Sequence, residues 1–192
     1  LDEDSVRDLI SILRENQIES VAIVLLHAYA NPDHERRIRD ILSAVLPDLW
    51  ISLSSEVCPE IREYERMSTA SANAYVQPLM ASYLTDLDSK LRTEGAVCPL
   101  FLMTSGGGLT TVQTARAHPI RLMESGPAGG AILAGHIALE CGLDKVLSYD
   151  MGGTTAKICL IDGGKPQTSR TFEVDRQYRF IKGSGLPLRI PV

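Results

Sequence analysis

The sequence of 192 residues lacks several features that would assign it to a special class of protein. Its longest apolar runs are short, such as residues 21–26, whereas a transmembrane helix needs roughly 20 apolar residues. Asp2, Glu3 and Asp4 stand where a signal peptide would carry basic residues. The formal net charge of −5 provides no basic surface for nucleic acid. We therefore expect a cytoplasmic protein that binds neither nucleic acid nor membranes.

Cysteine pairs with the spacing of metal or redox sites are also missing. No two of the four cysteines form a C-x-x-C pair, which argues against a zinc site and a thioredoxin motif. Two disulfides remain formally possible. Because hydrophobic residues make up 44% of the chain, a sufficient core is available without disulfides. We predict reduced, buried thiols at Cys58, Cys98, Cys141 and Cys159.

The sequence does contain an alternation of strand-like and helical segments. Helical spacing of apolar residues, or a capped start, marks the segments 6–13, 38–45, 61–92, 110–117 and 125–138. Short apolar runs typical of covered strands are 20–26, 50–54, 100–103 and 120–123. Pro78 predicts a break or kink that divides the longest helix in two. The alternation predicts an α/β fold with a largely parallel sheet.

The pattern changes near residue 144. Two strand-like segments joined by the turn 150–153 predict a β-hairpin, and a second turn at 162–164 leads to further strand-like residues. Helical periodicity does not return in the sequence after this point. We predict a domain boundary there, so that residues 1–144 belong to one α/β domain and residues 145–192 begin a second.

The sharpest candidate for a binding site is the sequence Ser-Tyr-Asp-Met-Gly-Gly-Thr-Thr within that hairpin. Its two glycines can adopt positive φ and turn backbone N–H groups toward an anion. Its two threonines add hydroxyl donors, and its aspartate can hold Mg²⁺ through water. An ordinary hairpin turn is the alternative, since a single D-x-G-G-T is a weak motif. The candidate residues are Asp150, Gly152, Gly153, Thr154 and Thr155.

Two other glycine-rich segments follow predicted strands. Residues 124–130 open a helix, whose free N–H groups attract phosphate or carboxylate. There Ser125 could cap the helix and Gly126 permits close approach, although tight helix packing explains the glycines equally well. Residues 104–108, Thr-Ser-Gly-Gly-Gly, form either a plain loop or part of a ligand crevice at the end of a strand. With parallel strands, all three segments could line one crevice.

The remaining polar residues indicate no specific chemistry. The four histidines lack metal-ligand spacing, and the G-x-S-x-G motif of many hydrolases is absent from the sequence. A dense group of charged residues is typical of a solvated helix face. Its members are Glu60, Arg62, Glu63, Glu65 and Arg66.

Several short motifs, in the right order, resemble the ATP-dependent hydantoinase/5-oxoprolinase family, specifically its A-type subunit. The matching segments are 21–26, 31–35, 51–57, 59–66, 73–76, 125–129 and 150–154. The resemblance implies an actin-like ATPase fold, shared with sugar kinases and Hsp70, in which ATP lies between two domains. It places this chain at the end of the first domain and the start of the second. Because Leu1 is not an initiator Met, we expect a piece of a longer protein that is inactive by itself.

The resemblance also implies an activity, namely ATP-dependent opening of a cyclic amide such as 5-oxoproline or a hydantoin. Phosphorylation of the amide oxygen would make a good leaving group at the carbon that water attacks. The alternatives are a subunit of an ATP-dependent ketone carboxylase and a non-catalytic nucleotide-binding module. The implied partners are a B-type hydantoinase/oxoprolinase subunit and the small cyclic amide, within an oligomer.

The resemblance implies a role for each candidate residue. Asp150 would act on Mg²⁺, and residues 152–155 would hold the phosphates of ATP. Ser125 and Gly126 would lie in the nucleotide or substrate crevice. Many relatives carry an acid where this sequence has Lys157, which leaves the role of that position open.

Overall fold

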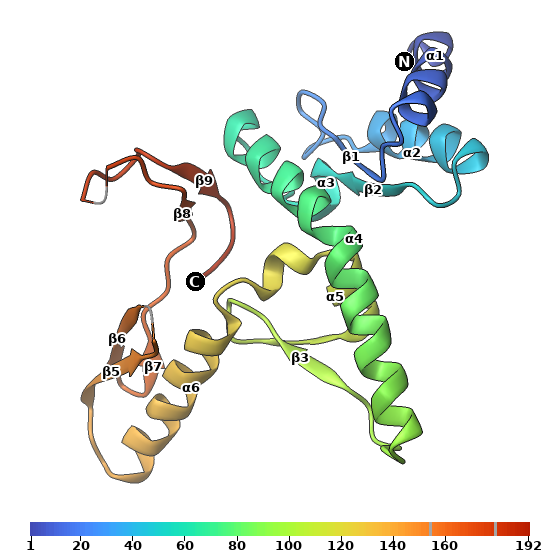
Figure 1. Ribbon diagram of the computed structural model, residues 1–192. Coiled ribbons are helices and arrows are strands. Elements are labelled where there is room, and N and C mark those ends of the chain that lie inside the picture. The colour runs from blue at the N-terminus through green and yellow to red at the C-terminus, as the bar shows by residue number, and fades with distance from the viewer. Residues whose placement is uncertain (154, 179) are drawn as a thin grey trace.

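Residues 1–153, 155–178 and 180–192 are described in the computed structural model, which Figure 1 shows. Helices and short strands alternate in the first part of the chain, and hairpins dominate the last part. The helices are α1 (Glu3–Glu15), α2 (Asp33–Val45), α3 (Ser54–Val57), α4 (Glu63–Thr93), α5 (Val112–Ala117), the 3₁₀ helix η1 (Pro119–Leu122) and α6 (Ser125–Glu140). The strands are β1 (Ser20–Ile23), β2 (Trp50–Leu53), β3 (Phe101–Met103), β4 (Leu109–Thr111), β5 (Lys145–Met151), β6 (Ala156–Asp162), β7 (Lys165–Pro166), β8 (Phe172–Val174) and β9 (Leu186–Leu188).

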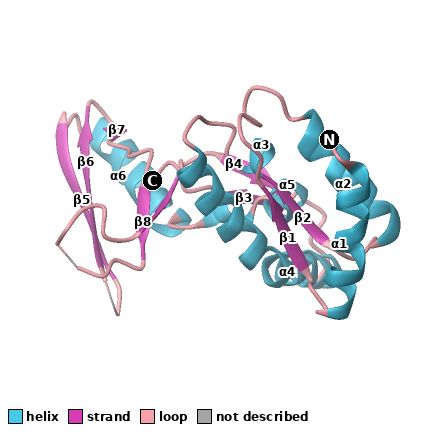
Figure 2. Ribbon diagram, turned by 90° about the horizontal axis from the view of Figure 1, so that it is seen from above, coloured by secondary structure: helices cyan, strands magenta, loops and turns pink. Residues whose placement is uncertain are grey.

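The N-terminal elements build a layered core. Asp2 caps α1, since its carboxylate accepts a hydrogen bond from the Ser5 backbone N–H at 3.2 Å. β1 and β2 pair in parallel, and they lie between the α1–α2 pair and α4 (Figure 2). Full burial of each aliphatic side chain stabilises this core by about 1.5–3 kcal/mol. Its buried residues are Val6, Ile23, Ile41, Leu42 and Leu53.

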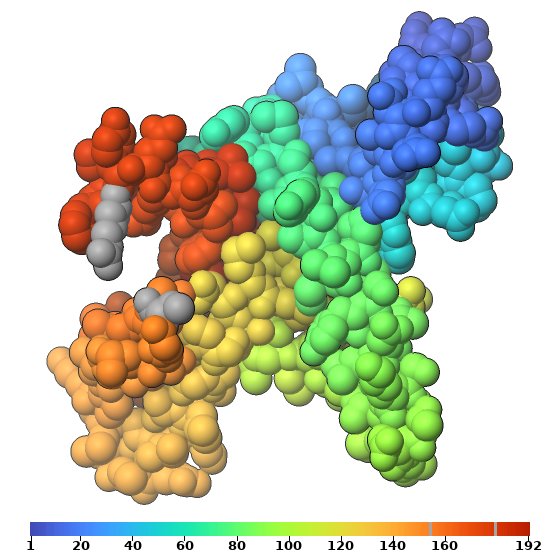
Figure 3. All heavy atoms as spheres, in the orientation of Figure 1, coloured from blue at the N-terminus to red at the C-terminus, as the bar shows by residue number. Residues whose placement is uncertain are grey.

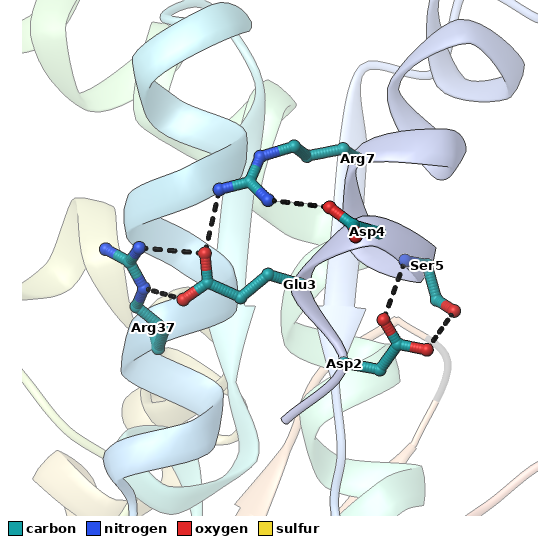
Figure 4. Close-up of polar contacts among 6 residues, drawn as sticks. All are labelled: Asp2, Glu3, Asp4, Ser5, Arg7 and Arg37. Carbon is teal, nitrogen blue, oxygen red and sulfur yellow. Dashed lines mark hydrogen bonds and ion pairs between the residues drawn. The ribbon is translucent and has the colours of Figure 1, made fainter.

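Polar contacts join α1 to α2 at the edge of this core. Arg37 on α2 donates from Nε and Nη2 to the two carboxylate oxygens of Glu3, at 2.7 and 3.0 Å, and Arg7 adds a third bond at 2.8 Å (Figure 4). The hydrogen bond from Arg37 holds the pKa of the Glu3 carboxyl below its ordinary value. Because these side chains border on solvent, the contacts orient α1 more than they stabilise the protein.

Helix α4 continues across Pro78 as one helix of 31 residues, so the predicted division into two helices is wrong. A proline removes one helical hydrogen bond, but packing can outweigh that loss. Along its length α4 packs against β1, β2, α5, η1 and β9. None of the helices among the described residues has the length and apolar character needed to cross a membrane.

Two further expectations about strands are also wrong. The segment 120–123 is largely η1, because Pro119 suits the first turn of a helix and the Ile120 N–H donates to the Asn73 side chain at 3.2 Å. The sheet is not largely parallel, since β1–β2 is the parallel pair and the other pairs among the described strands are antiparallel. The short loop 104–108 between β3 and β4 permits only an antiparallel hairpin.

The predicted hairpin around the Gly-Gly turn is confirmed. β5 and β6 pair from Lys145 opposite Asp162 to Met151 opposite Ala156. Helix α6 lies along one face of this hairpin (Figures 1 and 2). Helix α6 packs closely against the turn that follows β6, since a Cβ on Gly135 of α6 would lie 2.7 Å from the Gly164 carbonyl oxygen. The opposite face of the hairpin leaves apolar side chains exposed: Leu147, Tyr149, Met151, Ile158 and Leu160.

The C-terminal segment returns to the first part of the chain. β9 pairs with β8 and packs against α4, which Figure 3 shows as red spheres beside green ones. Leu188 and Ile190, which are 0% and 2% exposed, belong to a second core cluster. Its other buried members are Val57, Cys58 and Ile120.

The predicted domain boundary falls in the turn between α6 and β5. Elements on its two sides are in contact, because α6 packs on the β5–β6 hairpin and β9 packs on α4. The division into residues 1–144 and 145–192 therefore stays a prediction.

Candidate functional site

Three glycine-rich segments meet around a cavity of about 830 Å³. The 104–108 loop contributes Ser105, Gly106 and Gly107, the start of α6 contributes Glu124, and the β5–β6 hairpin contributes Asp150. The crevice expected from the sequence is therefore present, although the strands leading into it are not parallel. The cavity has the features of a ligand site, with a mainly apolar wall and a few polar groups that converge on it.

The predicted site residues divide into two groups. Asp150 lines the cavity. Among the residues that the structure describes, the other predicted ones do not form its wall, and Thr154 lies outside the described residues. Those others are Ser125, Gly126, Gly152, Gly153 and Thr155.

The turn that follows Asp150 is tighter than the sequence indicates. β5 runs through Met151, and the Gly152 N–H donates to the Thr155 carbonyl oxygen at 3.2 Å, so this amide closes the turn. Gly152 and Gly153 are not among the glycines with positive φ in the described residues. Apart from the neighbours of each glycine in the chain, no heavy atom of the described residues lies within 4 Å of a Cβ built on either glycine. The turn thus leaves open space for an anion.

Lys157 and Glu124 form an ion pair at the cavity. Lys157 lies directly opposite Asp150 on β6, and its Nζ is 2.6 Å from Oε2 of Glu124. Glu124 has φ 59° and is the N-cap of α6, so the expectation that Ser125 caps this helix is wrong. Sequence reasoning missed the pair, because the two residues are far apart in the chain, although the unusual lysine was a signal.

Sequence reasoning also missed the importance of Ser105 at this site. Ser105 lines the cavity, its exposed fraction is 3%, and its Oγ has no hydrogen-bond partner among the described residues. Its backbone N–H donates to the Arg121 carbonyl oxygen at 2.8 Å. The only hint in the sequence was the run of glycines that follows it.

Other motif residues build a buried polar network away from the cavity. Arg66 is completely buried, so the prediction of a solvated position is wrong for it. Its guanidinium donates to the Ser54 hydroxyl at 3.2 Å and to the Leu25 carbonyl oxygen at 2.8 Å. Glu35, also fully buried, accepts from the Ser54 hydroxyl at 2.6 Å. Each charge is hydrogen-bonded, as buried charges must be, and the network therefore has a structural role.

A second network involves Asn73. Its amide nitrogen donates to the Ser52 hydroxyl at 2.9 Å and to the Ala117 carbonyl oxygen at 3.1 Å. Gln77, one turn further along α4, accepts from the same hydroxyl at 3.0 Å. These bonds join α4 to β2 and to the end of α5, which precedes the loop into α6.

The thiols are free, as predicted, but not all of them are buried. Cys58 is buried and Cys159 is half-buried, whereas Cys98 and Cys141 are exposed. The prediction of four buried thiols is therefore wrong for those two, which lie in or beside turns that contact little of the chain. Burial raises the pKa of the Cys58 thiol. Within the described parts of the chain, no three His, Cys, Asp or Glu side chains form a metal-binding group.

The fold and the cavity together define an α/β protein with a cavity between glycine-rich segments. Residues 66–192 match the family model described as Hydantoinase/oxoprolinase, and residues 1–46 match the model of the Hydantoinase/oxoprolinase N-terminal region. The chain therefore belongs to the hydantoinase/oxoprolinase family.

Individual relatives cover nearly the whole chain. The caprolactamase subunit alpha of Pseudomonas jessenii is 36% identical over 170 residues, which are 88% of this chain and 24% of that subunit. The crystal structure of the ATP-dependent caprolactamase from Pseudomonas jessenii has a TM-score of 0.79 and 33% identity, over 100% of this chain and 27% of that chain. The nucleotide-free structure of acetone carboxylase has a TM-score of 0.81 and 26% identity, over 100% of this chain and 26% of that chain. The chain thus spans about a quarter of the length of these relatives.

Proposed function

We propose that this chain is part of an ATP-dependent hydrolase of cyclic amides with an actin-like ATPase fold. The observation that carries the proposal is the position of Asp150, which lines the cavity and also precedes the Gly-Gly turn. One carboxylate can therefore serve a substrate in the cavity and phosphates at the turn. The similarity to caprolactamase supports a lactam or another cyclic amide as the substrate.

The residues at the turn fit Mg²⁺-ATP. Asp150 is exposed, and one carboxylate suffices for Mg²⁺, which keeps several waters and binds phosphate oxygens as well. The open space around Gly152 and Gly153 lets phosphate approach the backbone, and the Thr155 hydroxyl adds a donor. ATP, when bound, would supply the phosphoryl group that activates an amide oxygen. Ser125 and Gly126, in the first turn of α6, stand beside the cavity and are proposed to border the nucleotide.

We further propose the setting in which the site works. The name of the caprolactamase relative describes a subunit, which supports a partner subunit of B type for this protein too. Such a partner would complete the substrate site within an oligomer, in the cytoplasm. A ketone carboxylase is the second candidate function, and the similarity to acetone carboxylase supports it. We place it second because the identity to the acetone carboxylase structure is 26%, against 33% for the caprolactamase structure over the same residues.

The test uses the complete protein with its B-type partner and measures ADP release. We expect stimulation by caprolactam, 5-oxoproline or hydantoin and formation of the ring-opened product. Stimulation that needs both acetone and bicarbonate would instead identify a carboxylase. ADP release that none of these compounds stimulates would contradict both enzymatic functions and favour a nucleotide-binding module.

The Asp150→Asn variant tests the role of the carboxylate. It keeps the shape of the side chain and removes the charge that would hold Mg²⁺, so we expect amide-stimulated ADP release to fall about 100-fold or more. Asp162→Asn is the matched control, because Asp162 is an exposed aspartate at the other end of the same hairpin. Turnover in Asp150→Asn equal to that of the control would show that Asp150 does not hold the metal.

A further inference from the structure

The hydroxyl of Ser105 is a buried hydrogen-bonding group that the described residues leave unsatisfied. The residue is 3% exposed, and its Oγ finds no partner in the described part of the chain. A buried polar group without a partner costs about 1–3 kcal/mol. Since Ser105 lines the cavity, rotation of its side chain would present the hydroxyl to a molecule bound there.

Backbone hydrogen bonds hold the 104–108 loop, so the backbone of Ser105 cannot easily move away from the cavity. The Thr104 N–H donates to the Gly108 carbonyl oxygen at 2.8 Å, and the Gly107 N–H donates to the Thr104 carbonyl oxygen at 2.9 Å. The Ser105 N–H is bound to the Arg121 carbonyl oxygen. Gly107 has φ 80°, and a Cβ at this position would collide with the Ile132 side chain on α6. The backbone therefore keeps Ser105 at the cavity wall.

The charges and the apolar wall of the cavity indicate what kind of molecule it accepts. Among the described lining residues, the charged ones are two carboxylates and one ammonium, Glu124, Asp150 and Lys157. The ammonium is already paired with Glu124. The net negative charge opposes a triphosphate in the cavity itself, whereas a neutral molecule meets no such barrier. Much of the remaining wall is apolar and suits the methylene groups of a ring: Pro127, Ala128, Ala131, Ile132 and Phe172.

We propose that the Ser105 hydroxyl donates a hydrogen bond to the carbonyl oxygen of a cyclic amide bound in this cavity. The inference rests on the proposed function and adds the place and the orientation of the substrate. The apolar ring contacts the wall formed by α6 and Phe172 of β8, and its carbonyl oxygen faces Ser105. Asp150 on β5 lines the same cavity and precedes the phosphate turn, so substrate and turn share one carboxylate.

The test is the Ser105→Ala variant of the complete protein with its partner subunit. The amide is whichever of caprolactam, 5-oxoproline and hydantoin stimulates ADP release by the unmodified protein. Loss of one hydrogen bond to a carbonyl raises the KM for this amide about 10-fold, while the KM for ATP stays within about twofold. The thermal unfolding temperature does not fall, because the hydroxyl has no partner among the residues that the structure describes.

Ser55→Ala is the matched control. The Ser55 hydroxyl is likewise buried and without a partner among the described residues, but Ser55 does not line the cavity. An unchanged KM for the amide in Ser105→Ala would overturn the inference, as would a KM that rises for ATP instead. A failure of the proposed function is seen in a different measurement. In that case no cyclic amide stimulates ADP release by the unmodified protein, and the inference about Ser105 is then wrong as well.

Discussion

Lys157 shows how much the role of one residue depends on its surroundings. On β6 it stands opposite Asp150, yet its ammonium contacts Glu124 at the start of α6. Glu124 holds a left-handed backbone conformation, which a residue with a side chain seldom adopts. The ion pair therefore joins the hairpin to a helix start whose backbone is mildly strained. The side chains of Lys157 and Glu124 are 36% and 24% exposed, so solvent weakens the pair only in part.

Lys157→Met should lower the free energy of unfolding by about 1 kcal/mol, because it removes the ion pair and keeps much of the aliphatic stem. Urea unfolding measures this change. Lys145→Met is the control, since Lys145 is an exposed lysine on the neighbouring strand β5. Equal stability of the two variants would mean that the Glu124 contact contributes nothing.

The 3₁₀ helix η1 matters more to the site than its four residues suggest. It lies between α5 and α6, its Ile120 N–H is bound by Asn73, and the carbonyl oxygen of its Arg121 holds the backbone of Ser105. His118 precedes it as the N-cap and is half-buried. Burial, together with the nearby Arg121 cation, lowers the pKa of His118.

The pKa shift of His118 predicts a pH dependence of stability. In the unfolded chain His118 titrates with an ordinary pKa of about 6.5, and its pKa in the folded protein is lower. The unfolded chain therefore binds a proton more readily, so stability falls as the pH drops below about 6.5. Urea midpoints at about pH 7.5 and pH 5.5 measure the fall, which should be smaller in His118→Gln. His34→Gln, at an exposed position, should keep the full fall, and equal behaviour of both variants would refute the assignment.

Across the whole molecule, the C-terminal segment joins parts of the chain that are distant in sequence. The Arg189 N–H donates to the Thr69 hydroxyl at 2.9 Å, and Leu188 is fully buried beside α3 and η1. The same segment approaches the 104–108 loop, because a Cβ on Gly106 would lie 3.0 Å from Cγ of Pro191. Packing by the last residues therefore helps to hold the Ser105 loop in place.

Leu188→Ala should destabilise the protein by about 3 kcal/mol, because it leaves a cavity in a fully buried cluster. Leu186→Ala on the same strand should cost less than about 1 kcal/mol, since Leu186 is 38% exposed. Thermal or urea unfolding separates the two outcomes. A similar loss in both variants would mean that β9 does not pack on α4 in solution.

Much of the fold could be predicted, because helix starts, glycine turns and apolar spacing are local signals. Residues 3–15 and 33–45 are helical near their predicted positions, and the hairpin of β5 and β6 lies where its turn was expected. Residues 120–123 were misassigned because a short apolar run suits a strand or a helix equally well. The predicted burial of Cys98 and Cys141 failed because burial depends on what packs against a residue, which spacing does not reveal.

The sequence by itself determined the alternation of elements, the three glycine-rich segments and, through the order of its motifs, the family. These properties depend on residues that are close together in the chain. Only the tertiary structure decided that Arg66 is buried, that Lys157 pairs with Glu124 and that the Ser105 hydroxyl has no partner in the described part of the chain. Each of these facts depends on contacts between residues that lie dozens of positions apart in the chain. The packing of the whole chain determines such contacts, and no local sequence pattern does.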